Sequence, residues 1–185
     1  IRDRINSQAF RAHEMIADLM LFARPPTLQP ERVDLAELID TLIEELTPAA
    51  QAQGTTLEHH RPADPVKILG DRVQLAVALR ALVVNSLEAL GSGGQVDFQA
   101  RPAAGRPPTM SAQLIIRDTG PGITAEVRQH MFDPFFSGRE AGRGLGFGLS
   151  KCWRIVTDHG GQIVVDSAQG GGATFTLHLP VAQRR

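Results

Sequence analysis

The chain has 185 residues, which corresponds to one domain with at most a short appendage. Hydrophobic residues make up 42% and charged residues 21%, as in an ordinary soluble globular protein. The 19 basic and 20 acidic residues give a net charge of −1, which argues against a general nucleic-acid binder. One cysteine, Cys152, excludes an internal disulfide framework and a cysteine-cluster metal site. We expect a cytoplasmic fragment of a longer protein, without direct membrane contact, because no apolar run approaches the ~18 residues of a membrane span.

Residues 1–24 are predicted to form one helix with a coiled-coil seam. Its apolar residues alternate between spacings of four and three, namely Ile5, Ala9, Ala12, Ile16, Leu19 and Ala23. A lone helix of this length is marginal in water, so the seam predicts a partner helix. Pro25 and Pro26 end the helix. The predicted division of the chain is a helical segment at 1–26, a linker at 27–31 and a domain at 32–182.

The rest of the chain is predicted to mix helices and strands. The expected helices are Leu35–Gln53, Asp71–Leu90, Thr124–Met131 and a helix that follows the glycine-rich stretch and ends near His159. The expected strands are Val33–Asp34, Thr55–His60, Val66–Leu69, Gln95–Arg101, Ser111–Asp118, Gln162–Ser167 and Ala173–Leu179. Helices followed by a run of antiparallel-looking strands predict an α+β sandwich with the helices on one face of the sheet.

The helix at Asp71–Leu90 is predicted to have a core face and a ligand face. The core face consists of Ala76, Leu79, Val83, Leu87 and Leu90, and the second face carries Ala78, Ala81, Asn85 and Glu88. The amide carbonyl of Asn85 is a hard oxygen that suits Mg²⁺, and the small residues one turn before it leave room for a ligand. A solvent-facing asparagine explains the same pattern, so this helix alone does not show whether Asn85 binds a metal ion.

The turn Asp118-Thr119-Gly120-Pro121-Gly122-Ile123 follows a predicted strand. Its two glycines permit positive φ and a close approach of the backbone to a ligand. The carboxylate of Asp118 can accept a hydrogen bond from an exocyclic amine such as N6 of adenine. An ordinary tight turn without a ligand is the alternative.

An aromatic cluster and a glycine-rich stretch follow. Phe132-Asp133-Pro134-Phe135-Phe136-Ser137 holds three phenylalanines, which are either core anchors or the base of a movable lid. Gly142 to Ser150 carries four glycines at alternate positions and opens a helix. Outward-pointing N–H groups and the helix dipole suit a phosphate there, although a hinge without a ligand remains the alternative. The stretch lacks the Gly-Lys-Ser/Thr of a Walker A loop.

Together, in this order, these clusters resemble the N, G1, F and G2 boxes of sensor histidine kinases. The kinases share an ATPase superfamily with the gyrase B subunit and with mismatch-repair and chaperone ATPases. Asn85 lies in Val-Val-Asn-Ser-Leu-Glu-Ala-Leu, and Gly170-Gly171-Gly172-Ala173-Thr174-Phe175 is similar to the family's closing glycine motif. The resemblance covers about residues 31–180. It implies a Bergerat-type fold, a two-layer α/β sandwich whose mixed sheet is covered on one face by three helices.

The resemblance also implies a function. The domain would bind ATP and Mg²⁺ and transfer the γ-phosphoryl group to a histidine on an upstream helix, for relay to the receiver domain of a response regulator. Residues 1–26 resemble the second helix of the family's dimerisation hairpin, so a homodimer is expected through 1–24 with that upstream helix. Asn85 would bind the metal, and Asn85 and Arg139 would be catalytic. The nucleotide contacts would be Asn85, Glu88, Asp118, Gly120, Gly122, Ile123, Phe132, Arg139, Arg143, Gly144, Leu145, Gly146, Phe147, Gly148, Leu149 and Thr174.

Three departures from the family pattern leave other functions open. Ala81 stands where the family usually has a first asparagine, and Arg139 stands where it usually has a lysine. No phosphoacceptor motif appears, because His13-Glu14 precedes Asp-Leu-Met-Leu-Phe-Ala-Arg-Pro too closely. The other histidines show no metal-ligand spacing. One alternative is therefore a catalytically idle, ATP-binding dimeric scaffold. The other is a serine kinase or ATPase of the same superfamily.

Overall fold

The structure is a computed structural model that describes residues 27–103, 111–136 and 146–181. Its elements in chain order are β1 (Glu31–Asp34), α2 (Leu35–Ala52), β2 (Thr56–His60), β3 (Lys67–Gly70), α3 (Arg72–Leu90), β4 (Gln95–Pro102), β5 (Ser111–Asp118), α4 (Ala125–His130), α5 (Gly148–Asp158), β6 (Gln162–Ser167) and β7 (Ala173–Pro180). These elements agree with the predicted ones within a few residues. The predicted helix at 1–24 lies outside the described residues.

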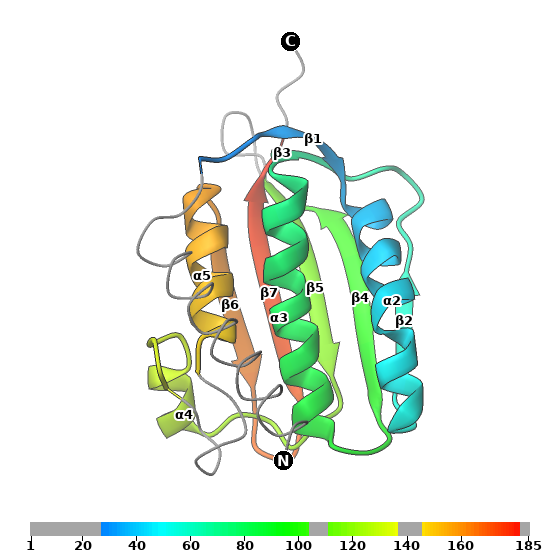
Figure 1. Cartoon of the computed structure of the whole chain (residues 1–185), viewed down its shortest axis with the longest axis vertical. Coiled ribbons are helices and arrows are strands. Elements are labelled where there is room, and N and C mark those ends of the chain that lie inside the picture. The colour runs from blue at the N-terminus through cyan, green and yellow to red at the C-terminus, as the bar shows by residue number, and fades with distance from the viewer. Residues whose placement is uncertain (1–26, 104–110, 137–145, 182–185) are drawn as a thin grey trace, which may run out of the picture.

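The described strands form two sheets. The main sheet has five strands in the order β2-β4-β5-β7-β6. It is mixed, because β2 runs parallel to β4 whereas the remaining neighbours are antiparallel. Strands β1 and β3 pair in a small antiparallel sheet at the upper end of the molecule (Figure 1). Helices α2, α3 and α5 cover one face of the main sheet, which confirms the predicted sandwich (Figure 1).

Alternation along the strands builds the core between the two layers. Val96, Phe98 and Ala100 of β4 are buried, whereas the residues between them are more exposed. Phe175 and Leu177 of β7 continue this apolar surface toward the other edge. Because successive side chains of a strand point to opposite faces, the intervening residues lie on the face that the helices leave open.

The predicted assignment of residues to the two faces of α3 is partly wrong. Ala78, expected on the ligand face, is fully buried, and Ala76 and Leu90 are only half-buried. The reason is the central position of α3, which lies between α2 and α5 and is covered on its flanks as well as on its sheet side (Figure 1). By length and apolar composition, α3 is the one helix among the described residues that could cross a membrane. Its place in the core accounts for that composition.

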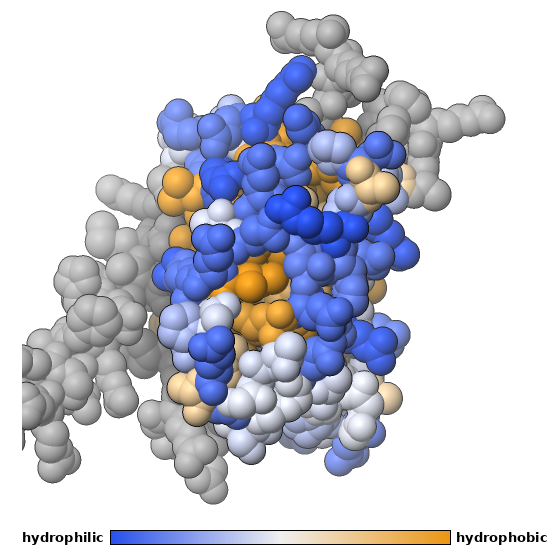
Figure 2. All heavy atoms as spheres, turned by 90° about the vertical axis from the view of Figure 1, so that its right-hand side faces the viewer, coloured by the Kyte–Doolittle hydropathy of each residue, from blue (hydrophilic) through white to orange (hydrophobic). Residues whose placement is uncertain are grey.

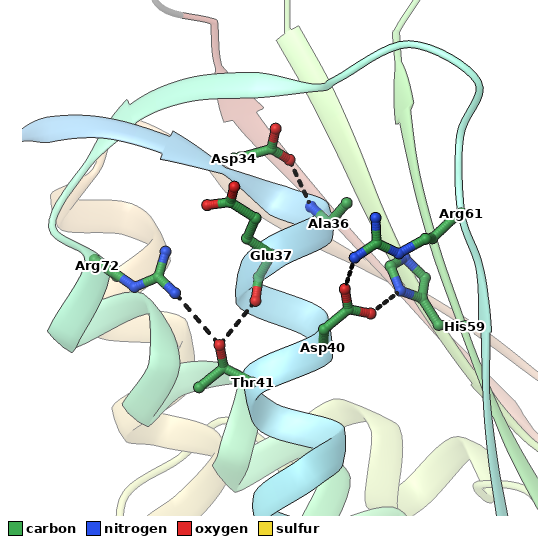
Figure 3. A network of polar contacts seen from close by, with 8 residues as sticks. All are labelled: Asp34, Ala36, Glu37, Asp40, Thr41, His59, Arg61 and Arg72. Carbon is green, nitrogen blue, oxygen red and sulfur yellow. Dashed lines mark hydrogen bonds and ion pairs between the residues drawn. The ribbon is translucent and has the colours of Figure 1, made fainter.

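Side chains at the start of α2 tie this helix to its surroundings. The carboxylate of Asp34 caps the helix by accepting a hydrogen bond from the Ala36 amide at 2.9 Å. One turn further, the Thr41 hydroxyl donates to the Glu37 carbonyl at 2.9 Å and faces the guanidinium of Arg72, whose nitrogen lies 3.4 Å away. Since Arg72 belongs to α3, this contact joins two helices of the layer (Figure 3).

A second contact joins α2 to the edge strand β2. Asp40 accepts hydrogen bonds from His59 Nδ1 at 2.7 Å and from the guanidinium of Arg61 (Figure 3). Burial, together with the charge of the neighbouring His60, lowers the pKa of His59 from its ordinary 6.5. The neutral imidazole is therefore favoured, with Nδ1–H donating to Asp40.

The edge of the molecule formed by α2 and β2 is mainly hydrophilic. Figure 2 faces this edge and shows a strip of hydrophobic atoms between two hydrophilic borders. Ile43 of α2 and Leu57 of β2 are half-buried and pack against the core. Part of the apolar interface between the helix layer and the sheet is therefore exposed at this edge.

Candidate functional site

The buried carboxylate of Asp118 is the fixed point of the site. It lies at the end of β5, 4% exposed, and accepts three hydrogen bonds. The Ser86 hydroxyl of α3 donates to Oδ2 at 3.0 Å, and the amides of Gly120 and Ala173 donate to Oδ1 at 2.9 and 3.2 Å. A carboxylate has about four acceptor positions, so Oδ2 keeps capacity for one more donor.

Gly120 keeps space open beside this carboxylate. A Cβ added at Gly120 would lie 2.9 Å from Oδ1 of Asp118 and 3.9 Å from the Cβ of Ala89. A side chain at position 120 would therefore crowd the carboxylate and narrow the gap toward α3. The absence of a side chain suits the approach of a flat ligand.

The turn after Asp118 packs closely on the turn between β6 and β7. Gly122 and Gly172 both have φ of +77°, and a Cβ on either would lie 2.1 Å from a backbone carbonyl oxygen, that of Ala168 or of Asp118. The Ile123 amide also donates to the Ser167 hydroxyl at 2.8 Å. These contacts require glycine and hold the turn in one conformation.

The N-terminus of α5 faces α3. The Cβ of Ala81 lies 3.9 Å from the position that a Cβ on Gly148 would take. Asn85 is half-buried one turn further along α3, and Glu88 is exposed. Phe147 precedes α5 and offers no side-chain cap. The first N–H groups of a helix have no partner within the helix and favour an anion.

Phe135 of the aromatic cluster packs against the start of α5 rather than in the core. Phe135 is 68% exposed and has a φ of +67°, which is unusual for a residue with a side chain. Its ring meets the buried ring of Phe147 edge-on, with centroids 4.6 Å apart. Gly146 fits under this contact, because its Cβ would lie 2.6 Å from the Phe135 carbonyl carbon. The alternative of three core anchors does not hold for Phe135.

The other predicted residues are placed as follows. Phe132 and Leu149 are half-buried and pack against the core. Thr174 lies apart from the site. Its neighbours in β7, Ala173 and Phe175, are buried under the helices, so the side chain of Thr174 points to the opposite, open face of the sheet. The predicted residues that lie outside the described part of the chain are Arg139, Arg143, Gly144 and Leu145.

One residue of the site was not predicted. Ser86 is fully buried, and its hydroxyl donates to Asp118 from the helix residue next to Asn85. The sequence does contain a signal for Ser86, because it is a hydroxyl residue among the apolar residues of a core helix and a buried hydroxyl requires a hydrogen-bond partner. The turn of α3 at residues 81–86 thus lies beside both the carboxylate and the start of α5.

A second polar cluster lies on the opposite face of the sheet. Glu58 and His60 of β2 and Asp97 of β4 can present three ligand atoms within 4.8 Å of one another. The side-chain amide nitrogen of Gln95 donates to both carboxylates, at 2.9 Å to Glu58 and 2.6 Å to Asp97. The parallel pairing of β2 with β4 brings these residues together, which the spacing of the histidines in the sequence did not indicate.

The geometry suits a ligand with two different ends. The open acceptor beside Gly120 fits an amino group on a flat ring, and the start of α5 fits a multiply charged anion. Asn85 lies on the α3 face between them and offers a hard oxygen for a cation such as Mg²⁺. The described residues therefore suit an adenine nucleotide with its metal ion.

Comparisons with known proteins agree with this geometry. A family model described as histidine kinase-, DNA gyrase B- and HSP90-like ATPase matches residues 70–183. The sensor kinase CckA of Brucella abortus is 37% identical, over 95% of this chain and 20% of CckA. The sensor protein DivL of Caulobacter vibrioides is 34% identical, over 96% of this chain and 22% of DivL. This chain therefore spans about a fifth of the length of these curated relatives.

A solved structure supports the same assignment. The mycobacterial sensor histidine kinase MprB aligns with a TM-score of 0.68 and 29% identity, over 82% of this chain and 97% of that chain. The family model covers more than half of the chain and includes α3, Asp118 and the start of α5. The chain therefore belongs to the histidine kinase-, DNA gyrase B- and HSP90-like ATPases, as the ATPase domain of a bacterial sensor histidine kinase.

Proposed function

We propose that this domain binds Mg²⁺-ATP and donates the γ-phosphoryl group to a histidine. The observation that carries the proposal is the carboxylate of Asp118, fixed by three donors next to the space that Gly120 leaves open. Asp118 accepts a hydrogen bond from the exocyclic amine of adenine. Guanine presents a carbonyl at that position, which cannot donate to a carboxylate. Gly122 and Ile123 form the floor of the turn that holds the base.

The phosphates lie between α3 and the start of α5 in this proposal. Asn85 provides an oxygen ligand to Mg²⁺, and Glu88 lies one turn further along the same helix. The backbone N–H groups at Gly146 and Gly148 line the phosphates. Arg139, Arg143, Gly144 and Leu145 are the further phosphate contacts in this proposal. Arginine is a suitable phosphate partner because its guanidinium makes paired hydrogen bonds.

The reaction transfers one phosphoryl group and requires little covalent chemistry from the domain. A ring nitrogen of the acceptor histidine attacks the γ-phosphorus, the bond to the bridging oxygen breaks, and ADP leaves. The domain positions the reactants and neutralises charge. The acceptor lies on a helix upstream of this chain, residues 1–24 pair with that helix in a homodimer, and the phosphoryl group then passes to the aspartate of a response regulator. A cytoplasmic location of the domain is part of the same proposal.

The direct test is phosphotransfer to a supplied hairpin that carries the acceptor helix of the parent protein. We expect phosphate on a histidine of the hairpin, recognised because phosphohistidine is lost in acid. Asn85→Ala should abolish the transfer, since it removes a ligand to the ion that neutralises the transferred group. Thr157→Ala, an exposed position on α5, is the matched control and should transfer normally. Phosphate on His13 in this chain alone would contradict the proposal.

A catalytically idle scaffold is the second candidate, and Ala81 is the observation in its favour. A side chain at position 81 faces the start of α5, where the family's usual asparagine would add a polar contact. One hydrogen bond corresponds to about 0.5–1.5 kcal/mol, or a three- to tenfold change in ATP affinity. Ala81→Asn should therefore keep or raise that affinity. A wild type that binds ATP but never phosphorylates its own hairpin would establish the scaffold. Acid-stable phosphate on serine would instead favour the serine kinase alternative.

A further inference from the structure

Ser167, at the end of β6, joins the two turns that meet beside Asp118. Its hydroxyl accepts a hydrogen bond from the Ile123 amide at 2.8 Å and donates one to the Gly172 carbonyl at 2.7 Å. Ile123 belongs to the turn that follows β5, residues 119–123, which we call the base turn. Gly172 belongs to the turn between β6 and β7. Because a serine hydroxyl can donate and accept at the same time, one side chain links the two turns.

The strand register places Ser167 close to the carboxylate of the site. Ala173 of β7 lies opposite Ser167 of β6 and, on its other side, opposite Asp118 of β5. The Ala173 amide donates to Oδ1 of Asp118 at 3.2 Å. Strand β5 ends and β7 begins at the lower end of the sheet, where the two turns lie (Figure 1). One strand alone therefore separates Ser167 from the carboxylate that is proposed to bind the base.

The turn between β6 and β7 also touches the base turn through its backbone. The Gly170 amide donates to the Pro121 carbonyl at 2.6 Å. A Cβ on Gly122 would lie 2.1 Å from the Ala168 carbonyl oxygen and 3.2 Å from Oγ of Ser167. The Ser167 hydroxyl thus occupies the narrow space between the two turns and supplies a side-chain contact where the others are backbone contacts.

The contact at Ile123 bears on the geometry of base recognition. Gly120 lies three residues before Ile123 in the base turn, and its amide donates to Oδ1 of Asp118 at 2.9 Å. A shift at one end of such a short turn also moves the space that Gly120 keeps open beside the carboxylate. Hydrogen bonds weaken steeply when donor and acceptor are poorly aligned, so a small shift is enough to weaken the contact with the base.

We infer that Ser167 is a positioning residue for adenine binding. It holds the base turn in the conformation that leaves the space beside Asp118 open, and it acts through the turn rather than by touching the nucleotide. The inference rests on the proposed binding of an adenine nucleotide. It adds a residue of the edge strand β6 that lies outside all the motifs from which the site was predicted.

Ser167→Ala tests the inference, because it removes only the hydroxyl. In calorimetric titrations of the full chain with ADP and Mg²⁺, we expect binding to weaken about three- to tenfold, the effect of one lost hydrogen bond. The ratio of the ADP affinities with and without Mg²⁺ should stay that of the wild type, because the metal ion lies at the phosphate end of the nucleotide. Asn85→Ala should show the opposite pattern, with the effect of Mg²⁺ lost.

Two further variants at the same position grade the effect. Ser167→Thr keeps the hydroxyl and should bind ADP within about twofold of the wild type. Ser167→Cys keeps a side chain of similar size, whose thiol is a weak donor and acceptor, and should lie between the threonine and alanine variants. The cysteine variant also serves as the test if the alanine variant does not fold. Wild-type affinity in the cysteine and alanine variants would contradict the inference.

Thr55→Val is the matched control for stability. Thr55 precedes the opposite edge strand β2 and is 5% exposed. Its hydroxyl accepts from the Gln53 side chain at 2.8 Å and donates to the Gly93 carbonyl at 2.7 Å, so it too bridges two segments. Valine has a similar shape without the hydroxyl. We expect Thr55→Val to lower the urea midpoint of unfolding while its ADP affinity stays that of the wild type.

The outcomes separate this inference from the proposed function. If the wild type does not bind ADP, the proposed function fails and the inference fails with it. If the wild type binds ADP and Ser167→Ala binds it equally well, the inference alone is wrong. An equal loss of affinity in Ser167→Ala and Thr55→Val would assign the effect to stability and would also overturn the positioning role.

Discussion

The two ends of α3 are held by different means. At the first turn, Asp71 caps the helix, binds the linker and contacts His159 at the end of α5, so protein groups supply the hydrogen bonds. From the middle of the helix to its last turn, the small residues Ala81 and Ala89 lie next to Gly148 and Gly120 of the site. At the first end, protein groups occupy the polar atoms of Asp71, whereas the second end keeps space for a ligand beside a tightly packed turn.

The largest effect that we expect concerns the turn that holds the binding end. Gly122→Ala should destabilise the domain by about 3 kcal/mol or more, because a Cβ there would combine positive φ with a clash against a carbonyl oxygen. Gly170→Ala is the matched control, since Gly170 has a φ of +79° but nothing within 4 Å of its Cβ position. It should cost about 1 kcal/mol. Urea unfolding measures both. Equal costs would mean that the close packing of the turn is unimportant.

The next effect separates recognition from stability within the binding end. Ser86→Ala should lower the free energy of unfolding by about 1–3 kcal/mol, because it removes a buried donor to Asp118. It should also reduce the preference for ATP over GTP, since the carboxylate loses one of its three fixed donors. Ser150→Ala removes another buried hydroxyl, which donates to the Phe147 carbonyl. This control should lose stability without changing the base preference. If both variants had the same preference for ATP over GTP, the proposed role of Ser86 in base recognition would be contradicted.

The smallest effect concerns the first turn of α3 and depends on pH. Asp71→Asn keeps a capping oxygen but loses the charge, which we expect to cost about 1 kcal/mol of stability at pH 7. Burial opposes the charge on Asp71, but the backbone N–H groups that donate to it outweigh burial and lower its pKa in the folded chain. Its contribution is therefore complete above pH 3.8 and is lost as the pH falls through the folded value. The difference between the two proteins should therefore shrink below pH 3.8. Urea unfolding at pH 7, 5 and 3 tests this, and a constant difference would exclude the charge as its source.

The sequence predicted the elements of the fold well because their signals are local. The cap at Asp71, the alternation in β4 and β5 and the glycines at the ends of helices each specify a short segment. The burial of Ala78 was not predictable from periodicity, since it depends on the helices that flank α3. The role of Ser86 and the contact between Asp71 and His159 also need the tertiary arrangement.

The site was predictable to a similar extent. The order of the motifs along the chain predicted Asn85, Asp118 and the glycines as site residues. Thr174 belongs to the closing glycine motif, but the alternation of β7 places its side chain on the open face of the sheet. A motif read along the sequence does not show on which face of a sheet each of its side chains lies. The predicted division of the chain at residues 26 and 31 stays a prediction.

The central claim is that Asp118 recognises adenine, and a titration of ATP against GTP tests it most directly. Wild type should bind ATP in the micromolar range in the presence of Mg²⁺ and bind GTP at least about tenfold more weakly, because a buried acceptor that faces a carbonyl is left unpaired. Asp118→Ala should lose most of that difference. Equal affinity of the wild type for ATP and GTP would contradict the account.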